Sequence, residues 1–564
     1  YTSRNRGDTH EQYEIGAQLG TLEDELARAV ATTSRNAQRE KGRDVERLFG
    51  EDEQAGNRKH AWDTIQDTRK RSRDGAGRAV PFARNRKGKV ASNARESAQN
   101  WRASWMEVGE YRPNDPVYDK EHRQEIEREL ERISELEEQR AQRQISSSEW
   151  MKDVEDIEEW ELDAPEFEDL HGINVGDIDA EEREKYTELN AMWGSEEFGP
   201  ALAQMKHYKA AGEDGIVAEF MKMGGKEVRE CILLLLNAVW RLECCPVRWT
   251  RAMAWPIYKA GVRSDPSNYR LITLLSAVCK VFERMITNRI TSLIRTSLKF
   301  NRPLITFTQV GFQFARSTLD AVYALILAIS IRRMCGMPTY LAFIDVKKAF
   351  PSAFKAGILV KLYRLGITGK CWRMLRNMYS TVHSRILTGQ ESDFSVEELE
   401  ALYYKIETGL REGSILSPVL YLLFINGFIE ELHARNLGVS VLSTQTGKRM
   451  WIGALMYCDD AVIVCNSPGE LQVALDILTK YAEKWRFKTH PVKSQVMCCC
   501  EAPAQRESRA MTEWWLMKQS IKEVQLYVYL GIILTPDIDF TQHTKATLQA
   551  AHRQGREALL LGVR

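Results

Sequence analysis

The chain has 564 residues, enough for several domains with separate hydrophobic cores. Lys and Arg together number 78, as do Asp and Glu, so the net charge excludes neither an acidic nor a basic partner. No run of about 18 apolar residues predicts a membrane span, and no secretory signal opens the chain. The eleven cysteines form no Cys-x-x-Cys pair, which argues against a zinc site and favours a reducing intracellular compartment.

Residues 1–190 are predicted to be a charged N-terminal extension or linker that is partly disordered. Within it, the basic run at 69–89 either contacts phosphates or is a solvated linker. A helix is predicted over 119–144, because one face carries Ile126, Leu130, Ile133 and Leu136. The stretch 155–184 is acidic, and no function is predicted before about residue 190.

Residues 451–465 contain two short apolar runs rich in β-formers on either side of Asp459 and Asp460. This pattern predicts a hairpin with both acids at its turn. The alternative is an ordinary surface turn. A third acid, Asp345, ends the β-rich run 339–345 and favours a metal site. Three carboxylates on one sheet can hold two divalent ions about 3.5–4 Å apart, the arrangement used in phosphoryl transfer.

Two of these segments resemble motifs of reverse transcriptases. Residues 343–350 read Phe-Ile-Asp-Val-Lys-Lys-Ala-Phe and resemble the first palm motif, and 457–460 read Tyr-Cys-Asp-Asp and resemble the Tyr-x-Asp-Asp box. The resemblance implies that Asp345 and Asp459 bridge two Mg²⁺ ions, with Mn²⁺ as a substitute. It further implies that Asp460 tunes the site and that the backbone carbonyl of Val346 completes one metal shell.

Phe350 follows Asp345 by five residues, where reverse transcriptases carry an aromatic side chain beneath the sugar. A ring at that position collides with a 2′-hydroxyl and so selects deoxynucleotides. RNA-templated RNA polymerases generally have a polar residue there. The alternative is a core aromatic at the start of a helix over 353–365.

Residues 209–216 resemble the opening motif of LINE-type (non-LTR) reverse transcriptase domains, Lys-Ala-x-Gly-x-Asp-Gly. Residues 255–276 resemble the fingers hairpin, which implies that Arg270 grips phosphate and Lys259 assists as a point charge. Either residue can instead be a surface base. Residues 309–318 resemble a further family segment, with Gln313 replacing the usual Arg, and we favour a structural role there with Arg316 as a template contact.

Residues 408–420 resemble the second palm motif, Gly-Leu-Arg-Gln-Gly-x-x-Leu-Ser-Pro. Gly413 is expected to allow close backbone approach to a nucleotide or template base. Ser417 and Pro418 predict a helix start with a serine cap and a first-turn proline. Glu412 replaces the usual Gln, and a carboxylate near a triphosphate is repulsive.

Residues 488–497 resemble the next motif, with His490 where Asn is common. Here Lys493 is expected near the pyrophosphate leaving group, as a charge or a general acid, unless it is a generic surface lysine. The hairpin motif of the primer grip is matched by Tyr529, Leu530 and Gly531. A helix from about residue 537 is predicted to begin the thumb.

The resemblance covers residues 195–540 and implies an α+β right-hand polymerase fold. Its parts are expected to be the fingers at 191–335, the palm at 336–535 and the start of a truncated helical thumb at 536–564. The implied function is RNA-directed DNA polymerisation for a non-LTR retrotransposon, copying an RNA template into cDNA from a DNA primer at a nicked target. The implied substrates are dNTPs, no membrane partner is expected, and the location is a cytoplasmic ribonucleoprotein and the nucleus.

Three alternatives stay open. An RNA-templated RNA polymerase shares the acids but not Phe350. A group II intron maturase has related palm motifs. A decayed or domesticated copy that binds RNA without polymerising is motivated by Glu412, Gln313 and His490. The chain lacks an initiating methionine and ends without a domain-like boundary, so we expect a fragment without the endonuclease and zinc knuckle of such an element.

Overall fold

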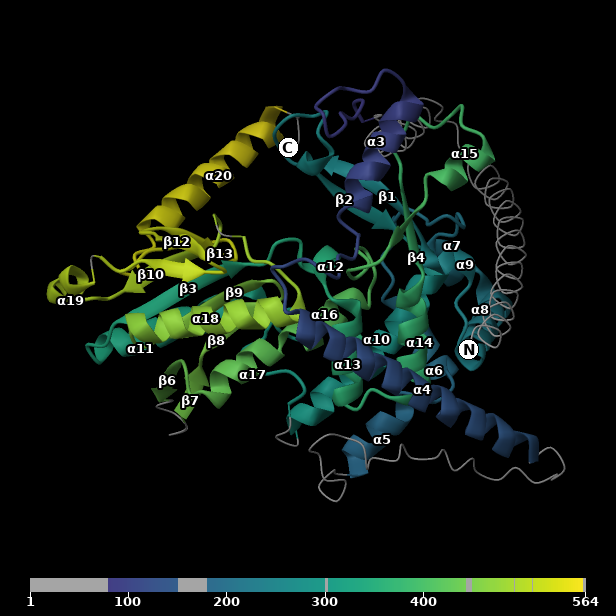
Figure 1. Ribbon diagram of the computed structural model, residues 1–564, viewed down its shortest axis with the longest axis horizontal. Helices are drawn as coiled ribbons and strands as arrows, with labels where there is room; N and C mark the ends of the chain where they lie inside the picture. The colour runs from purple at the N-terminus through teal and green to yellow at the C-terminus, as the bar shows by residue number, and fades with distance from the viewer. Residues whose placement is uncertain are drawn as a thin grey trace, which may run out of the picture.

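Figure 1 shows the computed structural model, which describes residues 80–150, 180–299, 303–442, 449–490, 492–509 and 511–560. Most of the predicted acidic stretch and the first part of the predicted basic run lie outside the described residues. Among the described helices, none is long and apolar enough to cross a membrane. All eleven cysteines are free thiols.

The centre of the fold is a six-stranded sheet in the order β11-β12-β10-β3-β9-β8. Strand β3 pairs antiparallel with both β10 and β9, and its continuous apolar run is buried along its length, as expected of a central strand. The strands are β3 (Thr339–Asp345), β8 (Ala454–Tyr457), β9 (Asp460–Cys465), β10 (Gln495–Cys499), β11 (Trp514–Leu516) and β12 (Gln519–Glu523).

Side chains of β3 alternate between two hydrophobic clusters, one on each face of the sheet. Helix α18 (Pro468–Trp485) packs on one face and α11 (Thr318–Met334) on the other. The side chain of Ser467 caps α18 by accepting a hydrogen bond from the Glu470 amide. Apolar side chains of α18 that are buried in the main core cluster include Leu471, Ala474, Leu475, Leu478 and Ala482.

A second sheet of four strands has the order β2-β1-β4-β5. Its β1–β2 hairpin confirms the strands predicted over 255–276, with Ile257 opposite Arg270. Strand β4 pairs parallel with β1 and antiparallel with β5. The strands are β1 (Arg251–Tyr258), β2 (Tyr269–Leu274), β4 (Val382–Ile386) and β5 (Tyr404–Ile406).

The remaining helices lie between, below and beside the two sheets (Figure 1). The apolar face of helix α10 belongs to the largest core cluster. These helices are α5 (Ala180–Glu188), α6 (Ser195–Ala203), α7 (Ala218–Met223), α8 (Gly225–Leu242), α9 (Val247–Thr250), α10 (Ala277–Lys299), α12 (Ala349–Ser352), α13 (Lys355–Arg364), α14 (Gly369–Ser380), α15 (Val396–Ala401), α16 (Ser417–Ile425) and α17 (Gly427–Ala434).

Smaller elements complete the described chain. Two hairpins are formed by β6 (Val439–Leu442) with β7 (Arg449–Ile452), and by β13 (Tyr527–Tyr529) with β14 (Ile532–Leu534). A 3-10 turn η4 (Pro266–Asn268) precedes β2, and α19 (Pro503–Ser508) follows β10. Helix α20 (Thr541–Leu560) lies where the sequence predicts the start of a thumb.

Residues 80–142, here called the N-terminal arm, pack against the rest of the chain. The arm contains α3 (Ala94–Met106) and, up to residue 142, most of α4 (Lys120–Trp150), and α4 confirms the helix predicted over 119–144. Its Ile126 and Ile133 are buried in the main core cluster. The ordered contacts of the arm ahead of α4 were not predicted, because their partners lie far away in sequence.

Candidate functional site

The predicted hairpin with two aspartates at its turn is present. Strands β8 and β9 pair so that Tyr457 lies opposite Asp460, and Cys458 takes a left-handed conformation with φ of 63° to make the tight turn. In the neighbouring register Asp345, the last residue of β3, lies opposite Asp460. The structure therefore brings the three predicted acids to one end of the central sheet.

The segment 309–311 packs against this turn and forms hydrogen bonds with its backbone. Fully buried Gln309 accepts a hydrogen bond from the Cys458 amide at 3.2 Å through its side-chain oxygen. The Val310 amide donates to the Met456 carbonyl at 2.9 Å. A Cβ on Gly311 would lie 2.6 Å from the Cys458 backbone nitrogen, so only glycine fits there. The structural role predicted for this segment is thus support of the acidic turn.

The acids influence one another electrostatically. Desolvation raises the pKa of Asp459, and the like charge of Asp345 adds to that effect. Asp460 is exposed, yet desolvation and the charges of Asp459 and Asp345 raise its pKa to about 6. Such mutual repulsion is what a bound cation relieves.

Among the described residues, no three His, Cys, Asp or Glu side chains are arranged as a ready-made metal site. The donor set still fits hard divalent ions, because these prefer carboxylate oxygen and the three converging acids repel one another without a cation. The residues that could hold such ions are Asp345, Asp459 and Asp460. Val346, buried and bridged to Thr489, directly follows the first of them.

The segment 488–494 holds Asp345 in place. The His490 amide donates to the Asp345 carbonyl at 2.8 Å, and the Asp345 amide donates to Ser494 Oγ at 3.3 Å. The Nζ of Lys493 lies 3.2 Å from Oδ2 of Asp345. Thus Lys493 is brought to the acids, as expected if it acts on the same substrate.

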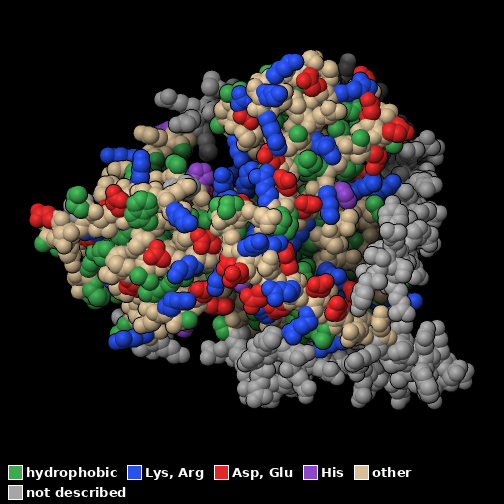
Figure 2. All heavy atoms as spheres, viewed as in Figure 1, with side chains coloured by type: hydrophobic (Ala, Val, Ile, Leu, Met, Phe, Trp, Pro, Cys, Tyr) green, Lys and Arg blue, Asp and Glu red, His purple; other side chains and the backbone are tan. Residues whose placement is uncertain are grey.

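A group of cations surrounds Glu412, and one of them, Lys259, also interacts electrostatically with Lys493. Electrostatic interactions link Glu412 to Lys259, Arg270 and Lys348. Burial raises the pKa of Glu412, and the three cations oppose that shift. Burial lowers the pKa of Lys259, with the charge of Arg270 adding to it. Figure 2 shows Lys and Arg side chains gathered in the hollow between the lobe carrying α3, β1 and β2 and the lobe carrying α20.

Lys348 was missed in the sequence. It directly precedes α12 in a left-handed conformation with φ of 52°. Its pKa is lowered by burial and by the neighbouring charges of Lys347 and Lys259. The available signal was the Lys-Lys pair that follows the Asp345 strand.

The loop 408–416 is fixed by a buried ion pair that was also missed. The Arg411 guanidinium lies 2.6 Å from the Glu283 carboxylate of α10, and both side chains are buried. The second Glu283 oxygen accepts from the Ile415 amide at 2.8 Å. Gly413 has a φ of 83°, and a Cβ there would lie 2.6 Å from the Thr273 carbonyl of β2. Gly413 thus lies close against the second sheet, and its approach to a nucleotide or template base stays a prediction.

The serine cap predicted for the next helix is wrong. Helix α16 begins at Ser417, and the residue at its N-cap position is Leu416, which makes no side-chain cap. Instead Ser417 Oγ donates to the Arg411 carbonyl at 2.8 Å. Because the Ser417 hydroxyl bonds to the loop 408–416, it is not used to cap the helix. Pro418 does lie in the first turn, as predicted.

Phe350 lies in α12 and is partly buried, with its ring 5.3 Å from that of Tyr421. The hairpin β13–β14 confirms the predicted turn, with Leu530 and Gly531 in left-handed conformations at its tip. Tyr529 is buried against Phe343 of β3 at 5.6 Å between ring centroids. The tip is thus anchored to the strand that carries Asp345.

Comparison with known proteins identifies this arrangement. Residues 257–534 match the family described as reverse transcriptase (RNA-dependent DNA polymerase). These residues are a reverse transcriptase domain. The domain includes all three acids, the cation group and the hairpin tip, and it therefore has the palm and fingers of a polymerase.

The relatives of this reverse transcriptase domain come from mobile elements. One is the probable RNA-directed DNA polymerase from transposon BS of Drosophila melanogaster, 24% identical over 64% of this chain and 37% of the relative. Another is the RNA-directed DNA polymerase from mobile element jockey of the same species, 24% identical over 63% of this chain and 36% of the relative. A third is the retrovirus-related Pol polyprotein from type-1 retrotransposable element R2 of Nasonia vitripennis, 24% identical over 57% of this chain and 29% of the relative.

These matches confirm the resemblance to reverse transcriptases of the LINE type. The chain spans little more than a third of the length of the first two relatives.

Proposed function

We propose that this chain is the RNA-directed DNA polymerase of a non-LTR retrotransposon and copies RNA into cDNA from a DNA primer at a nicked target. The observation that carries the proposal is the placement of Asp345 opposite Asp460 in the β3–β9 register, with Asp459 in the adjacent turn. The cations grouped around Glu412 supply a place for the triphosphate of an incoming dNTP.

In this proposal Asp345, Asp459 and Asp460 hold two divalent ions, Mg²⁺ or Mn²⁺, together with the Val346 carbonyl. Such ions supply Lewis-acid activation of the primer 3′-hydroxyl and charge neutralisation at the leaving pyrophosphate. Arginine at 270 suits bidentate binding of a phosphate, and the lysines at 259 and 348 act as point charges.

The remaining residues orient the substrates. Phe350 excludes the 2′-hydroxyl of a ribonucleotide, with Tyr421 packed behind its ring. Gly413 keeps the loop 408–416 against the second sheet. The exposed Gly531 and the adjoining Leu530 present the tip of their hairpin to the primer backbone, with Tyr529 as its anchor.

Primer extension on an RNA template with Mg²⁺ tests the proposal, with dNTPs or NTPs supplied in parallel. We expect extension with dNTPs only, and loss of at least about 100-fold in rate for Asp459→Asn. The matched control is Asp476→Asn, which changes an exposed aspartate on α18. Its rate should equal that of the unaltered chain.

The other outcomes separate the alternatives. Equal use of NTPs would contradict the role of Phe350 and favour an RNA polymerase. Firm RNA binding without extension would favour a copy that no longer polymerises. Activity that survives Asp459→Asn would remove the proposed metal site.

A further inference from the structure

The N-terminal arm is anchored at two places. Its first anchor is on the second sheet, where fully buried Trp101 of α3 packs edge-on against Tyr269 of β2 at 4.9 Å. Arg84 of the arm also forms an ion pair with Asp265, just ahead of β2. This end of the arm is therefore fixed to the sheet that carries Arg270.

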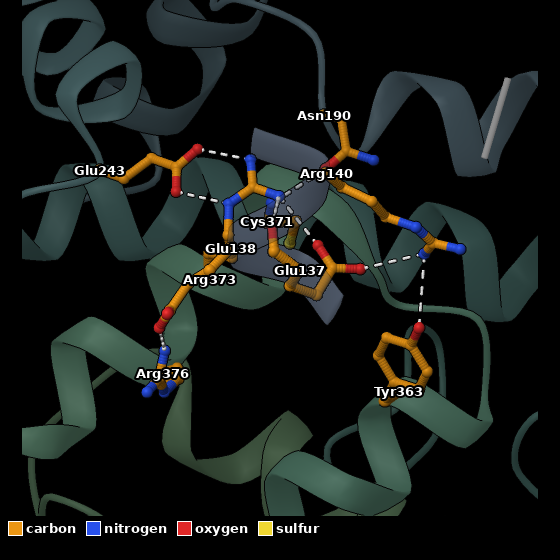
Figure 3. Close-up of polar contacts among 9 residues, drawn as sticks. All are labelled: Glu137, Glu138, Arg140, Asn190, Glu243, Tyr363, Cys371, Arg373 and Arg376. Carbon is orange, nitrogen blue, oxygen red and sulfur yellow. Dashed lines mark hydrogen bonds and ion pairs between the residues drawn. The ribbon is translucent and has the colours of Figure 1, made fainter. Parts of the chain in front are cut away.

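The second anchor is a buried charge network around α4 (Figure 3). Arg373 of α14 lies 2.8 Å from Glu137 of α4 and 2.7 Å from Glu243, which follows α8. Arg140 lies 3.3 Å from Glu137 and donates to Tyr363 at 3.4 Å. Glu137 is fully buried, so removing its partner would leave an uncompensated charge. The network sets the position of α4 along α14.

Residues 105–111 lie between these anchors in the sequence, and we call them the strap. The carbonyl of Gly109 accepts hydrogen bonds from the amides of Glu407 and Thr408, at 2.9 and 3.2 Å. The Tyr111 amide donates to the Glu407 carboxylate at 3.1 Å. The strap thus pairs with the chain that leads directly into the loop 408–416.

The same loop is tied to the turn that carries Phe350. The amide of Leu410 donates to the Phe350 carbonyl at 2.8 Å, and that of Gly409 donates to the Ala353 carbonyl at 2.9 Å. The ring of Tyr111 stacks parallel to that of Phe354, 6.3 Å away. Movement of the strap would therefore shift the loop and this turn together.

The strap also reaches a cation of the site directly. The Nζ of Lys348 lies 5.7 Å from the ring centroid of Trp105. Trp105 is half-buried, and its ring packs against the apolar cluster under the second sheet. A cation over an aromatic face is attracted by the negative charge density of the ring face. The ring thus limits where the flexible lysine side chain can lie.

We propose that the strap positions the nucleotide-binding side of the polymerase site, with Trp105 holding Lys348 for the triphosphate of the incoming nucleotide. The inference deepens the proposed function and rests on it. Trp105 acts through Lys348, and the Gly109 carbonyl acts through the loop 408–416, so both are positioning residues. Preorganised phosphate contacts lower the cost of ordering side chains when the nucleotide binds.

The test compares Trp105→Leu, which keeps an apolar side chain, with Trp105→Phe, which restores an aromatic face. The control is Arg95→Ala. Arg95 lies on the same helix α3 as Trp105, and the substitution breaks its exposed ion pair with Glu398 of α15. KM for a dNTP, kcat and the Kd for primer–template are measured for each. We expect Trp105→Leu to raise KM about 3- to 10-fold with kcat and Kd unchanged, Trp105→Phe to recover most of the loss, and Arg95→Ala to match the unaltered chain.

Hydrogen exchange gives a second readout that needs no turnover. With a dideoxy-terminated primer, binding of the next dNTP to the unaltered chain should slow exchange of the Glu407 and Thr408 amides and of the strap. This measurement decides the matter even if Trp105→Leu does not fold. Unchanged exchange in the strap would overturn the proposal.

Two further outcomes would also overturn it. One is an unchanged KM in folded Trp105→Leu. The other is weaker primer–template binding with unchanged KM, which would make the strap a template contact. Failure of the proposed function is distinct, because the unaltered chain would then not extend a primer at all.

Discussion

Lys493 and Asp345 form an ion pair across the end of the central sheet, with 3.2 Å between Nζ and Oδ2. The lysine is 60% exposed, so the contact alone adds little to stability. Its value lies in placing an ammonium group beside the acid that ends β3. Under the proposed function, the pair orients Asp345 and the ammonium is expected to donate a proton to the leaving pyrophosphate.

Substitution of Lys493 separates these two roles. Lys493→Met should lower kcat about 10- to 100-fold, because both the charge and the proton donor are lost. Lys493→Arg keeps the ion pair but cannot release a proton near neutral pH. Single-turnover rates for both variants, with exposed Lys480→Met as the control, provide the measurement. A fully active Lys493→Arg would exclude general-acid catalysis and leave the orienting role.

Gly311→Ala should disturb the acidic turn. The added Cβ would lie 2.6 Å from the Cys458 nitrogen, so the turn must shift. We expect kcat to fall at least about 10-fold and the free energy of unfolding to fall by about 1–3 kcal/mol. Gly469→Ala is the matched control, because a Cβ there meets nothing within 4 Å. Equal rates for the two variants would show that the turn tolerates displacement.

Glu412→Gln should strengthen nucleotide binding. The carboxylate shares its surroundings with Lys259, Arg270 and Lys348, and its charge repels a triphosphate. Because the pKa of Glu412 is raised by burial, the group is protonated more readily at acidic pH, where the two forms of the enzyme should converge. At higher pH we expect a KM for dNTP about 3- to 10-fold lower in the variant. A higher KM would mean that Glu412 orients the cations.

Lys355 of α13 should make stability depend on pH. It donates to the carbonyls of Tyr379 and Ile406, and burial lowers its pKa from 10.5 to about 7. The unfolded chain therefore binds more protons between about pH 7 and 10.5, so the destabilisation that this group causes shrinks as pH rises through that window. Below about pH 7 the lysine is charged in the folded chain as well, and its destabilising effect is at its maximum.

The difference in unfolding free energy between the unaltered chain and Lys355→Met isolates this contribution. Urea unfolding at pH 6.5 and pH 9.5 should show that difference moving by on the order of 2 kcal/mol in favour of the lysine form at pH 9.5. A difference that does not change with pH would show that Lys355 stays charged in the folded chain.

Much of the site was predictable because its signals are local. The β8–β9 hairpin and the Asp345 strand follow from short apolar runs that end in acids. Glu283 was not predictable, because it lies on an amphipathic helix and its partner Arg411 is 128 residues away. Trp105 was not predictable either, because it lies in a polar stretch and its partner Lys348 is further away in sequence than Arg411 is from Glu283. Ser417 had the local pattern of a helix cap, but its hydroxyl donates to the Arg411 carbonyl in the loop before it.

The anchoring of the N-terminal arm has a consequence for synthesis. Glu137 leaves the ribosome well before Arg373, which lies 236 residues further along the chain. At about 5–20 residues per second, that interval is on the order of 10–50 seconds. During it, Ile126 and Ile133 lack α13 and α14, two of the helices that pack against α4. Because such distant contacts form slowly, the nascent arm is a candidate for chaperone binding until α13 and α14 emerge.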